Sequence, residues 1–177
     1  MLKVQNLNFN AQSAQVIVVE ELEQLKSAIV RNMIADKQVA SGKTIRSMKV
    51  EKTTSGATLW GHKPFGVLET GRRAGRVPMD FEAIILQWMH DKGIQGTPIP
   101  YKTDRAHKYT PQERGDRNLA YHIARKIAKK GSKLHRDGGR NDVYSNEIPT
   151  TLQRIENRLF KFIDIEVEKV IKLNIGE

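Results

Sequence analysis

Gly42-Lys43-Thr44 is the first stretch whose residue types suggest chemistry, because a Gly-Lys-Thr tripeptide ends the phosphate-binding loop of many nucleotide-binding proteins. The complete motif needs a glycine five residues before Gly42, and this sequence has Lys37 there. Such a loop also follows a buried strand, whereas the apolar residues before Gly42 have helical spacing. The sequence therefore excludes this kind of nucleotide site and predicts a turn from a helix into a strand.

No other group of residues forms a catalytic pattern. Asp80 and Glu82 stand close together, but carboxylates are favoured in the first turn of any helix. The serines lack a nucleophile-elbow motif. The histidines show neither a metal-binding pair four residues apart nor an HExxH motif, which leaves open only a metal site built from distant residues; they are His62, His90, His107, His122 and His135. We predict a protein without enzymatic activity, cofactor or metal.

Positive charge is the strongest chemical signal, and it gathers in a glycine-rich segment and near the end of a predicted helix. Three interpretations stay open: a solvated surface, contact with phosphate groups, or docking on an acidic protein. Against sequence-specific nucleic-acid readout, aromatic residues make up only 6% and no known binding module is present. The candidate contact residues are Arg72, Arg73, Arg76, Arg125, Lys126, Lys129 and Lys130.

Composition limits the remaining classes. The 177 residues include 30 Lys and Arg against 20 Asp and Glu, a net charge of +10, and most of this excess lies in residues 62–147. No cysteine is present, which excludes disulfides, thiolate zinc sites and iron–sulfur clusters. No apolar run approaches the roughly 18 residues of a membrane span. We expect a soluble intracellular protein with no membrane partner.

The N-terminal third of the chain predicts an arm, a helix and a hairpin. The polar stretch 1–17 suggests a flexible N-terminal arm before a single domain over 18–177. A helix follows from an apolar stripe at helical spacing, namely Leu22, Leu25, Ile29 and Met33. Alternating residues on both sides of Ser55-Gly56 predict an antiparallel hairpin over 45–61, and residues 61–78 predict a basic loop.

The rest of the chain predicts three more helices. Asp80 and Gly93 bracket the clearest one, and its Trp88, like Trp60 in the hairpin, is expected in the core. Residues 95–118 predict a long loop with one short turn at Thr110-Pro111-Gln112-Glu113. Further helices are expected over 119–130 and from about 149 to 173, with a short strand near 143–144. This order predicts an α+β fold in which a small antiparallel sheet packs with three to four helices.

Four groups of residues, in order and spacing, resemble a known family. They are 40–44 (Ala-Ser-Gly-Lys-Thr); 68–72 (Leu-Glu-Thr-Gly-Arg) with Ala74, Gly75 and Pro78; Trp88 with 92–94 (Lys-Gly-Ile); and 123–127 (Ile-Ala-Arg-Lys-Ile) with 131–133 (Gly-Ser-Lys). Residues 40–160 are thereby similar to the neck, or tail-completion, proteins of tailed bacteriophages, which are small head–tail joining and minor virion proteins.

The resemblance implies a structural α+β subunit that forms a homo-oligomeric ring at the head–tail junction of the virion, after assembly in the host cytoplasm. Its implied partners are other copies of itself and the phage neck, portal or tail proteins, with non-specific contact to DNA in the channel. No catalytic residues carry over. We expect the 1–17 arm and the 95–118 loop to supply ring contacts and to become ordered only in the ring.

A second hypothesis follows from the charge alone. A small basic protein could handle or package phage DNA, with residues 72–76 and 125–133 as its phosphate-binding face. Its affinity would fall steeply with salt, whereas a ring held by apolar contacts would survive high salt.

Overall fold

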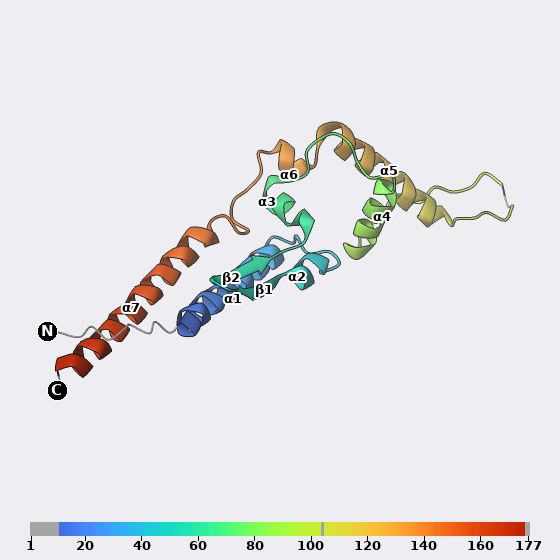
Figure 1. The fold of residues 1–177 in the computed structure, drawn as a ribbon. Helices are drawn as coiled ribbons and strands as arrows, with labels where there is room; N and C mark the ends of the chain where they lie inside the picture. The colour runs from blue at the N-terminus through green and yellow to red at the C-terminus, as the bar shows by residue number, and fades with distance from the viewer. Residues whose placement is uncertain (1–10, 104, 176–177) are drawn as a thin grey trace. The chain divides into compact units, whose positions relative to one another are not determined.

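The computed structural model describes residues 11–103 and 105–175 (Figure 1). In chain order these residues form α1 (Ala11–Ala35), α2 (Lys43–Ser47), β1 (Lys49–Thr53), β2 (Gly56–Trp60), the 3-10 helix η1 (Lys63–Gly66), α3 (Val67–Thr70), α4 (Phe81–Asp91), α5 (Pro111–Lys130), α6 (Lys133–Arg136) and α7 (Glu147–Ile175). The predicted α+β class with a small antiparallel sheet is confirmed. None of the helices in these residues combines the length and apolar character needed to cross a membrane.

The chain divides into two compact units, where the sequence predicted a single domain over 18–177. Unit 1 comprises residues 1–35, 46–62 and 142–177, and unit 2 comprises residues 36–45 and 63–141. The division arises because α4 and α5 bury an apolar core of their own in unit 2. Each unit is therefore stabilised by its own set of buried side chains.

Unit 1 is built around α1, whose apolar stripe is buried as its spacing predicts. Leu25, Ile29 and Met33 are all less than one-tenth exposed. The long helix α7 packs along α1, and both strands of the hairpin also contact α1. One helix thus supplies the common surface on which the other elements of unit 1 assemble.

The predicted hairpin is confirmed over residues 49–60, but residues 45–47 of the predicted 45–61 range belong to the short helix α2 and not to a strand. Val50 pairs with Leu59, and Thr53 pairs with Gly56 across a two-residue turn. The side-chain amide of Gln15 donates to the carbonyls of Thr53 (2.6 Å) and Gly56 (3.0 Å). Residues 11–17 are therefore the first turns of α1 rather than part of an arm, and residues 1–10 of the predicted arm lie outside the described residues.

A carboxylate buried between α1 and α7 holds these two helices together. Glu21, which is 2% exposed, accepts hydrogen bonds from Arg154 Nε (2.7 Å) and Arg158 Nη1 (2.9 Å). Burial raises the pKa of Glu21, but the hydrogen bonds and positive charges of the two arginines outweigh it, so its pKa lies below the usual value. Glu20 forms a second ion pair with Arg158 at 2.5 Å.

The core of unit 2 lies between α4 and α5. Phe81, Ile85 and Met89, spaced four residues apart on α4, are buried against Ala120 and Ala124 of α5. The prediction that Trp88 and Trp60 lie in the core is wrong, since they are 39% and 52% exposed. One neighbouring helix covers only a narrow stripe of α4, and Trp88 lies beside that stripe. Trp60 is the last residue of β2 in a sheet of two strands.

Of the two ends predicted for α4, only the C-terminal one has the predicted geometry. Asp80 stands at the N-cap, but its side chain makes no capping hydrogen bond. At the other end Gly93 has a φ of +66°, and its N–H donates to the His90 carbonyl at 3.0 Å. The N–H of Ile94 donates to the Met89 carbonyl at 2.8 Å, which completes a Schellman-type ending.

The predicted 95–118 loop is shorter than expected, because α5 begins at Pro111. Thr110 Oγ1 accepts from the Glu113 N–H, and the Glu113 carboxylate accepts from the Thr110 N–H at 2.7 Å. This capping box was expected to begin one short turn, but it begins a helix of 20 residues. Helical periodicity is hidden in the first turns because Gly115 and Asp116, rather than aliphatic residues, are buried there.

The predicted strand near 143–144 is also wrong. Residues 142–146 form a turn before α7, and Val143 is fully buried in unit 1. The Asn32 side-chain amide holds this turn by donating to the Val143 carbonyl and the Glu147 carboxylate, both at 3.2 Å. An apolar residue that is buried in a turn has the same local sequence signal as a short strand.

Candidate functional site

Two segments of unit 2 that are far apart in the sequence are joined backbone to backbone. We call residues 71–78 the arginine loop and residues 128–140 the facing segment. The Ser132 N–H donates to the Arg72 carbonyl at 2.8 Å, and the Arg72 N–H donates to Ser132 Oγ at 2.9 Å. The Gly75 N–H donates to the Ala128 carbonyl at 2.9 Å. These bonds fix the path of the arginine loop independently of its side chains.

Two glycines make this close approach possible. Gly71 has a φ of +65°, and a Cβ added there would lie 2.4 Å from the His135 backbone nitrogen. Gly131 has a φ of +78°, and its Cβ would lie 2.8 Å from the Arg72 carbonyl oxygen. Any other residue would be strained by its backbone angle and would also collide with the opposite segment. Glycine is thus required on both sides of the junction.

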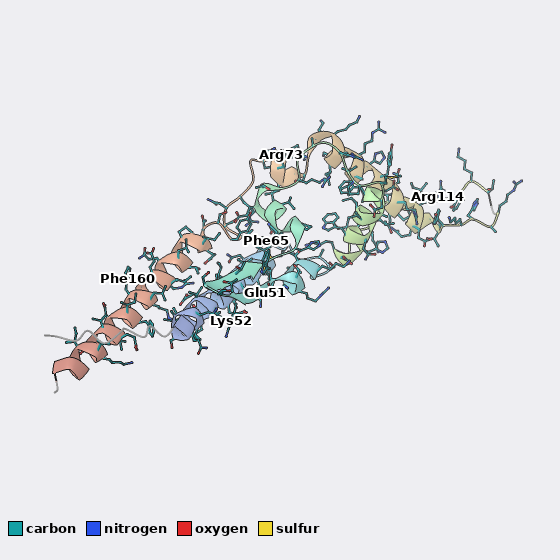
Figure 2. The ribbon with its side chains drawn as sticks, in the orientation of Figure 1. Glu51, Lys52, Phe65, Arg73, Arg114 and Phe160 are labelled. Carbon is teal, nitrogen blue, oxygen red and sulfur yellow. The ribbon has the colours of Figure 1, made fainter. Side chains whose placement is uncertain are left out.

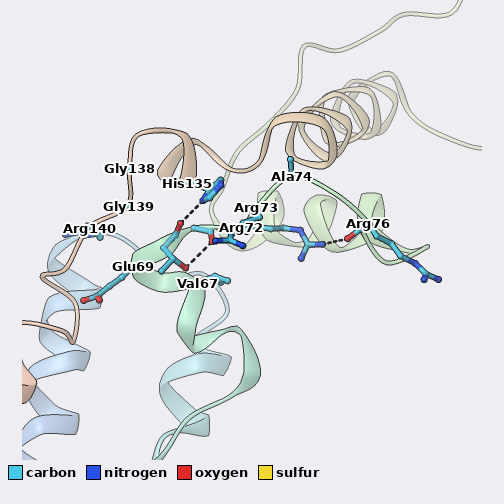
Figure 3. Close-up of a pocket in the computed structure, with 12 residues that line it drawn as sticks. Val67, Glu69, Arg72, Arg73, Ala74, Arg76, His135, Gly138, Gly139 and Arg140 are labelled. Atoms are coloured by element: carbon cyan, nitrogen blue, oxygen red, sulfur yellow. Dashed lines mark hydrogen bonds between the residues drawn. The ribbon is translucent and has the colours of Figure 1, made fainter.

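A pocket of about 660 Å³ opens where the two segments meet (Figure 3). Its walls combine arginine side chains with glycine backbone. The lining residues are Val67, Glu69, Thr70, Gly71, Arg72, Arg73, Ala74, Arg76, His135, Gly138, Gly139 and Arg140. All of them belong to unit 2.

The side chain of Arg72 supports the fold of the pocket through contacts within unit 2. Its guanidinium lies 5.1 Å from the centre of the Phe81 ring, and its Nη2 donates to the Arg76 carbonyl at 2.9 Å. Among the described residues, Arg72 Nε is one of two buried side-chain polar atoms without a hydrogen-bond partner, the other being Gln38 Oε1. A buried donor of this kind lowers the stability of the fold unless a ligand or a water molecule accepts its hydrogen bond.

The arginine and histidine side chains that also line the pocket differ in how they are held. Arg73 and Arg76 are exposed, whereas Arg140 is half-buried and forms an ion pair with Asp36. His135 Nδ1 lies 3.3 Å from the Thr70 carbonyl oxygen. Glu69 is the one carboxylate in the lining, and it is 3% exposed. The pocket therefore offers mainly arginine donors, chiefly those of the exposed Arg73 and Arg76, which suits a phosphate or carboxylate group.

The candidate residues fall into two groups. Arg72, Arg73 and Arg76 come together in the pocket, as neighbours along one loop. The four on α5 are exposed and do not line the pocket; they are Arg125, Lys126, Lys129 and Lys130. Arg125 instead donates to the Tyr121 hydroxyl at 2.6 Å. The bond from Gly75 to Ala128 nevertheless attaches the arginine loop to the same end of α5.

Sequence reasoning missed the lining residues from the facing segment. His135 and Arg140 lie about 60 positions beyond the arginine loop, and nothing local connects them to it. One signal was present, because adjacent Gly138 and Gly139 suggest a tight turn, and both have positive φ angles (+92° and +81°). No group of three or more potential metal ligands occurs among residues 11–103 and 105–175.

Charge is divided unequally between the two units. Unit 2 contains 19 Lys and Arg against 9 Asp and Glu, a net charge of +10. Unit 1 contains 11 of each and is neutral. The whole net positive charge of the chain therefore belongs to the unit that carries the pocket.

A search of protein-family models, of curated proteins and of solved structures finds no match to this chain.

Proposed function

We propose that this chain is a structural virion protein of a tailed bacteriophage: a ring-forming connector subunit at the head–tail junction, between portal and tail. The observation that carries the proposal is where the residues of the resemblance lie. The four groups, within 40–44, 68–78, 88–94 and 123–133, all fall in unit 2. Two of these groups contribute to the backbone junction of the arginine loop, through Arg72, Gly75 and Ser132.

The residues behind the resemblance thus include glycines that fix the backbone of unit 2. Gly71 and Gly131 are required by close backbone contacts, and Gly93 ends α4 with a positive φ. Residues that fix a backbone keep their type and spacing for a physical reason, so their order is more informative than a similar number of surface residues. The proposed function includes no catalytic step and no cofactor.

The test is quantitative mass spectrometry of purified particles, scaled to the major capsid protein. A ring at the head–tail junction predicts a fixed signal of roughly six to twelve copies per particle, a range that fits closed cyclic symmetry. Absence from finished particles would overturn the connector proposal. The measurement needs no variant, so a folding defect cannot imitate either outcome.

Two of the three arginines in the arginine loop are suited to docking on a partner. Arg72 supports the fold of unit 2 through Phe81 and the Arg76 carbonyl, whereas Arg73 and Arg76 expose their side chains. We expect an R73E/R76E variant to remain folded and to impair particle assembly. Normal particles from this variant would exclude docking through the arginine loop. Charge reversal at Arg72 is unsuitable, because it would disturb the loop itself.

The second candidate is a DNA-handling protein, and the concentration of the net charge of +10 in unit 2 favours it. In this alternative the arginine loop and the α5 end contact phosphates. The logarithm of the affinity for DNA would then fall linearly with the logarithm of the salt concentration, with a slope set by the number of phosphates neutralised. Salt-dependent DNA binding together with absence from virions would favour this candidate over the connector.

A further inference from the structure

A second cationic feature lies outside the pocket, in the connection between α4 and α5. We call residues 99–103 and 105–110 the stacked loop; in Figure 1 it extends beyond the N-terminal end of α5. The rings of Tyr101 and His107 stack with centroids 3.4 Å apart and planes 3° apart. The Arg114 guanidinium lies 4.1 Å from the centre of the Tyr101 ring. Two groups this close cannot share one ring face, so Tyr101 is sandwiched between Arg114 and His107.

The loop is anchored at its base to the first turns of α5. The Gly96 N–H donates to the buried Asp116 carboxylate at 2.6 Å, and the Gln112 amide donates to the Gly96 carbonyl at 2.9 Å. A Cβ on Gly115 would lie 2.1 Å from the Thr97 carbonyl oxygen, so helix and loop backbones touch directly. These contacts tie the base of the stacked loop to α5, and the expectation that the 95–118 loop becomes ordered only in the ring stays a prediction.

Further contacts hold the loop within itself. The Tyr101 hydroxyl donates to the Tyr109 carbonyl at 2.9 Å, and Arg114 Nη1 donates to the Ile99 carbonyl at 3.1 Å. Arg117 lies 4.2 Å from the centre of the Tyr109 ring. Arg114, labelled in Figure 2, lies at the start of α5 and thus supports the stack from the helix. Such preorganisation lowers the entropic cost of binding a ligand.

The outer surface of the loop is basic and ends in an exposed aromatic ring. Lys102, Arg105 and Lys108 are exposed, as is His107. The loop has one acidic residue in its sequence, Asp104, which lies outside the described residues. One face of the His107 ring contacts Tyr101, which leaves the other face for a further planar group.

We propose that the stacked loop binds single-stranded nucleic acid. Its three basic side chains contact backbone phosphates, and the outer face of His107 stacks on an unpaired base. Basic side chains interleaved with aromatic rings fit this ligand because each nucleotide offers a phosphate charge and a planar base. An acidic protein surface would pair with the basic side chains but would not account for the stacked aromatic rings. This inference is independent of the connector proposal.

The first experiment measures the salt dependence of binding to a fluorescent oligothymidylate, using the full chain. The loop variant is K102Q/R105Q/K108Q, and the matched control is K161Q/K169Q/K172Q on α7, which removes the same charge from exposed positions of unit 1. Removing one side chain that neutralises a phosphate lowers the slope of log affinity against log salt by about 0.7 for a single strand. We expect the loop variant to lower the slope by about 2 and the control to leave it unchanged. Equal slopes in the two variants would overturn the proposal.

The second experiment separates stacking from charge. H107A should weaken binding to the single strand about tenfold, as expected when one base no longer stacks, and should leave binding to a blunt duplex nearly unchanged. Equal effects on the two ligands, or no effect on either, would overturn the stacking role. Circular dichroism of each variant checks the fold, which these exposed side chains should not alter. Virion copy number does not enter either experiment, so failure here is distinct from failure of the connector proposal.

Discussion

Substituting Gly71 by alanine is the sharpest test of the junction that forms the pocket. The new Cβ would lie 2.4 Å from the His135 backbone nitrogen and 2.6 Å from Ser132 Oγ. Cβ atoms in proteins are not found so close to other heavy atoms, so the two segments must separate. Because the obstructing atoms include backbone, a change of rotamer cannot relieve the contact.

The expected decrease in stability follows from two effects. The φ of +65° places an alanine in the left-handed region, at a cost of about 1–2 kcal/mol. Separation of the segments also breaks the two hydrogen bonds between Arg72 and Ser132, each of which contributes about 1 kcal/mol. Together these effects predict that G71A lowers the free energy of unfolding of unit 2 by about 3–4 kcal/mol.

The assay is urea unfolding followed by the fluorescence of Trp88, in a W60F background. Trp60 belongs to unit 1 and Trp88 to unit 2, so this background reports on the unit that contains the junction. Two glycines provide controls. Gly138 has a φ of +92° but no atom within 4 Å of an added Cβ, and Gly66 has neither a positive φ nor a close neighbour.

The three variants separate strain from collision. G66A should change stability by less than about 0.5 kcal/mol. G138A should cost about 1–2 kcal/mol, because only the backbone angle is unfavourable. G71A should exceed G138A by about 2 kcal/mol, the contribution of the broken hydrogen bonds. Equal costs for G71A and G138A would refute the argument that close backbone contact holds the arginine loop in place.

Three further predictions concern other parts of the chain. The lowered pKa of Glu21 means that its carboxylate stabilises unit 1 above the usual value near 4.5, and that this stabilisation is lost as pH falls through the folded-state pKa. E21Q should therefore destabilise unit 1 at pH 7 and weaken its dependence on pH below 4.5 in urea unfolding, whereas E156Q, on an exposed position of α7, should leave both unchanged. T110A removes the N-cap of α5 and should cost about 1 kcal/mol by the same measurement in unit 2; a cost near zero would contradict the capping role. G115A should force the stacked loop away from α5 and speed its cleavage by trypsin, while N118A, exposed on the same helix, should not; equal rates would contradict the anchoring of the loop.

Local sequence signals predicted the elements whose ends are set by local backbone chemistry. Gly93 ends α4 because its left-handed backbone allows the final turn to close, and residues around Ser55-Gly56 form the hairpin. The start of α5 was signalled by its capping box, yet its length was not, because Gly115 and Asp116 interrupt the apolar stripe. Those two residues are buried because they contact residues 96–97, and no local sequence pattern reveals these contacts.

The candidate site was predicted in part for a similar reason. The basic character of Arg72, Arg73 and Arg76 is visible in the sequence, but their grouping with His135 and Arg140 is not. That grouping depends on hydrogen bonds between segments about 60 residues apart. Exposure was also misjudged, since Trp88 has the spacing of a core residue on a helix that is covered along only one stripe.

Composition and local patterns were sufficient to predict the α+β class, the excess of positive charge, the absence of cysteine chemistry and the glycines at which the backbone must turn. Composition and short-range backbone preferences are properties of neighbouring residues, so they can be read without a structure. The packing of distant segments assigns this charge to one of two units and brings Gly71 and Gly131 against the opposite segment. The same packing brings Tyr101, His107 and Arg114 into one stack. Such contacts arise from the packing of distant segments, and the spacing of residues along the chain does not encode their distance in space.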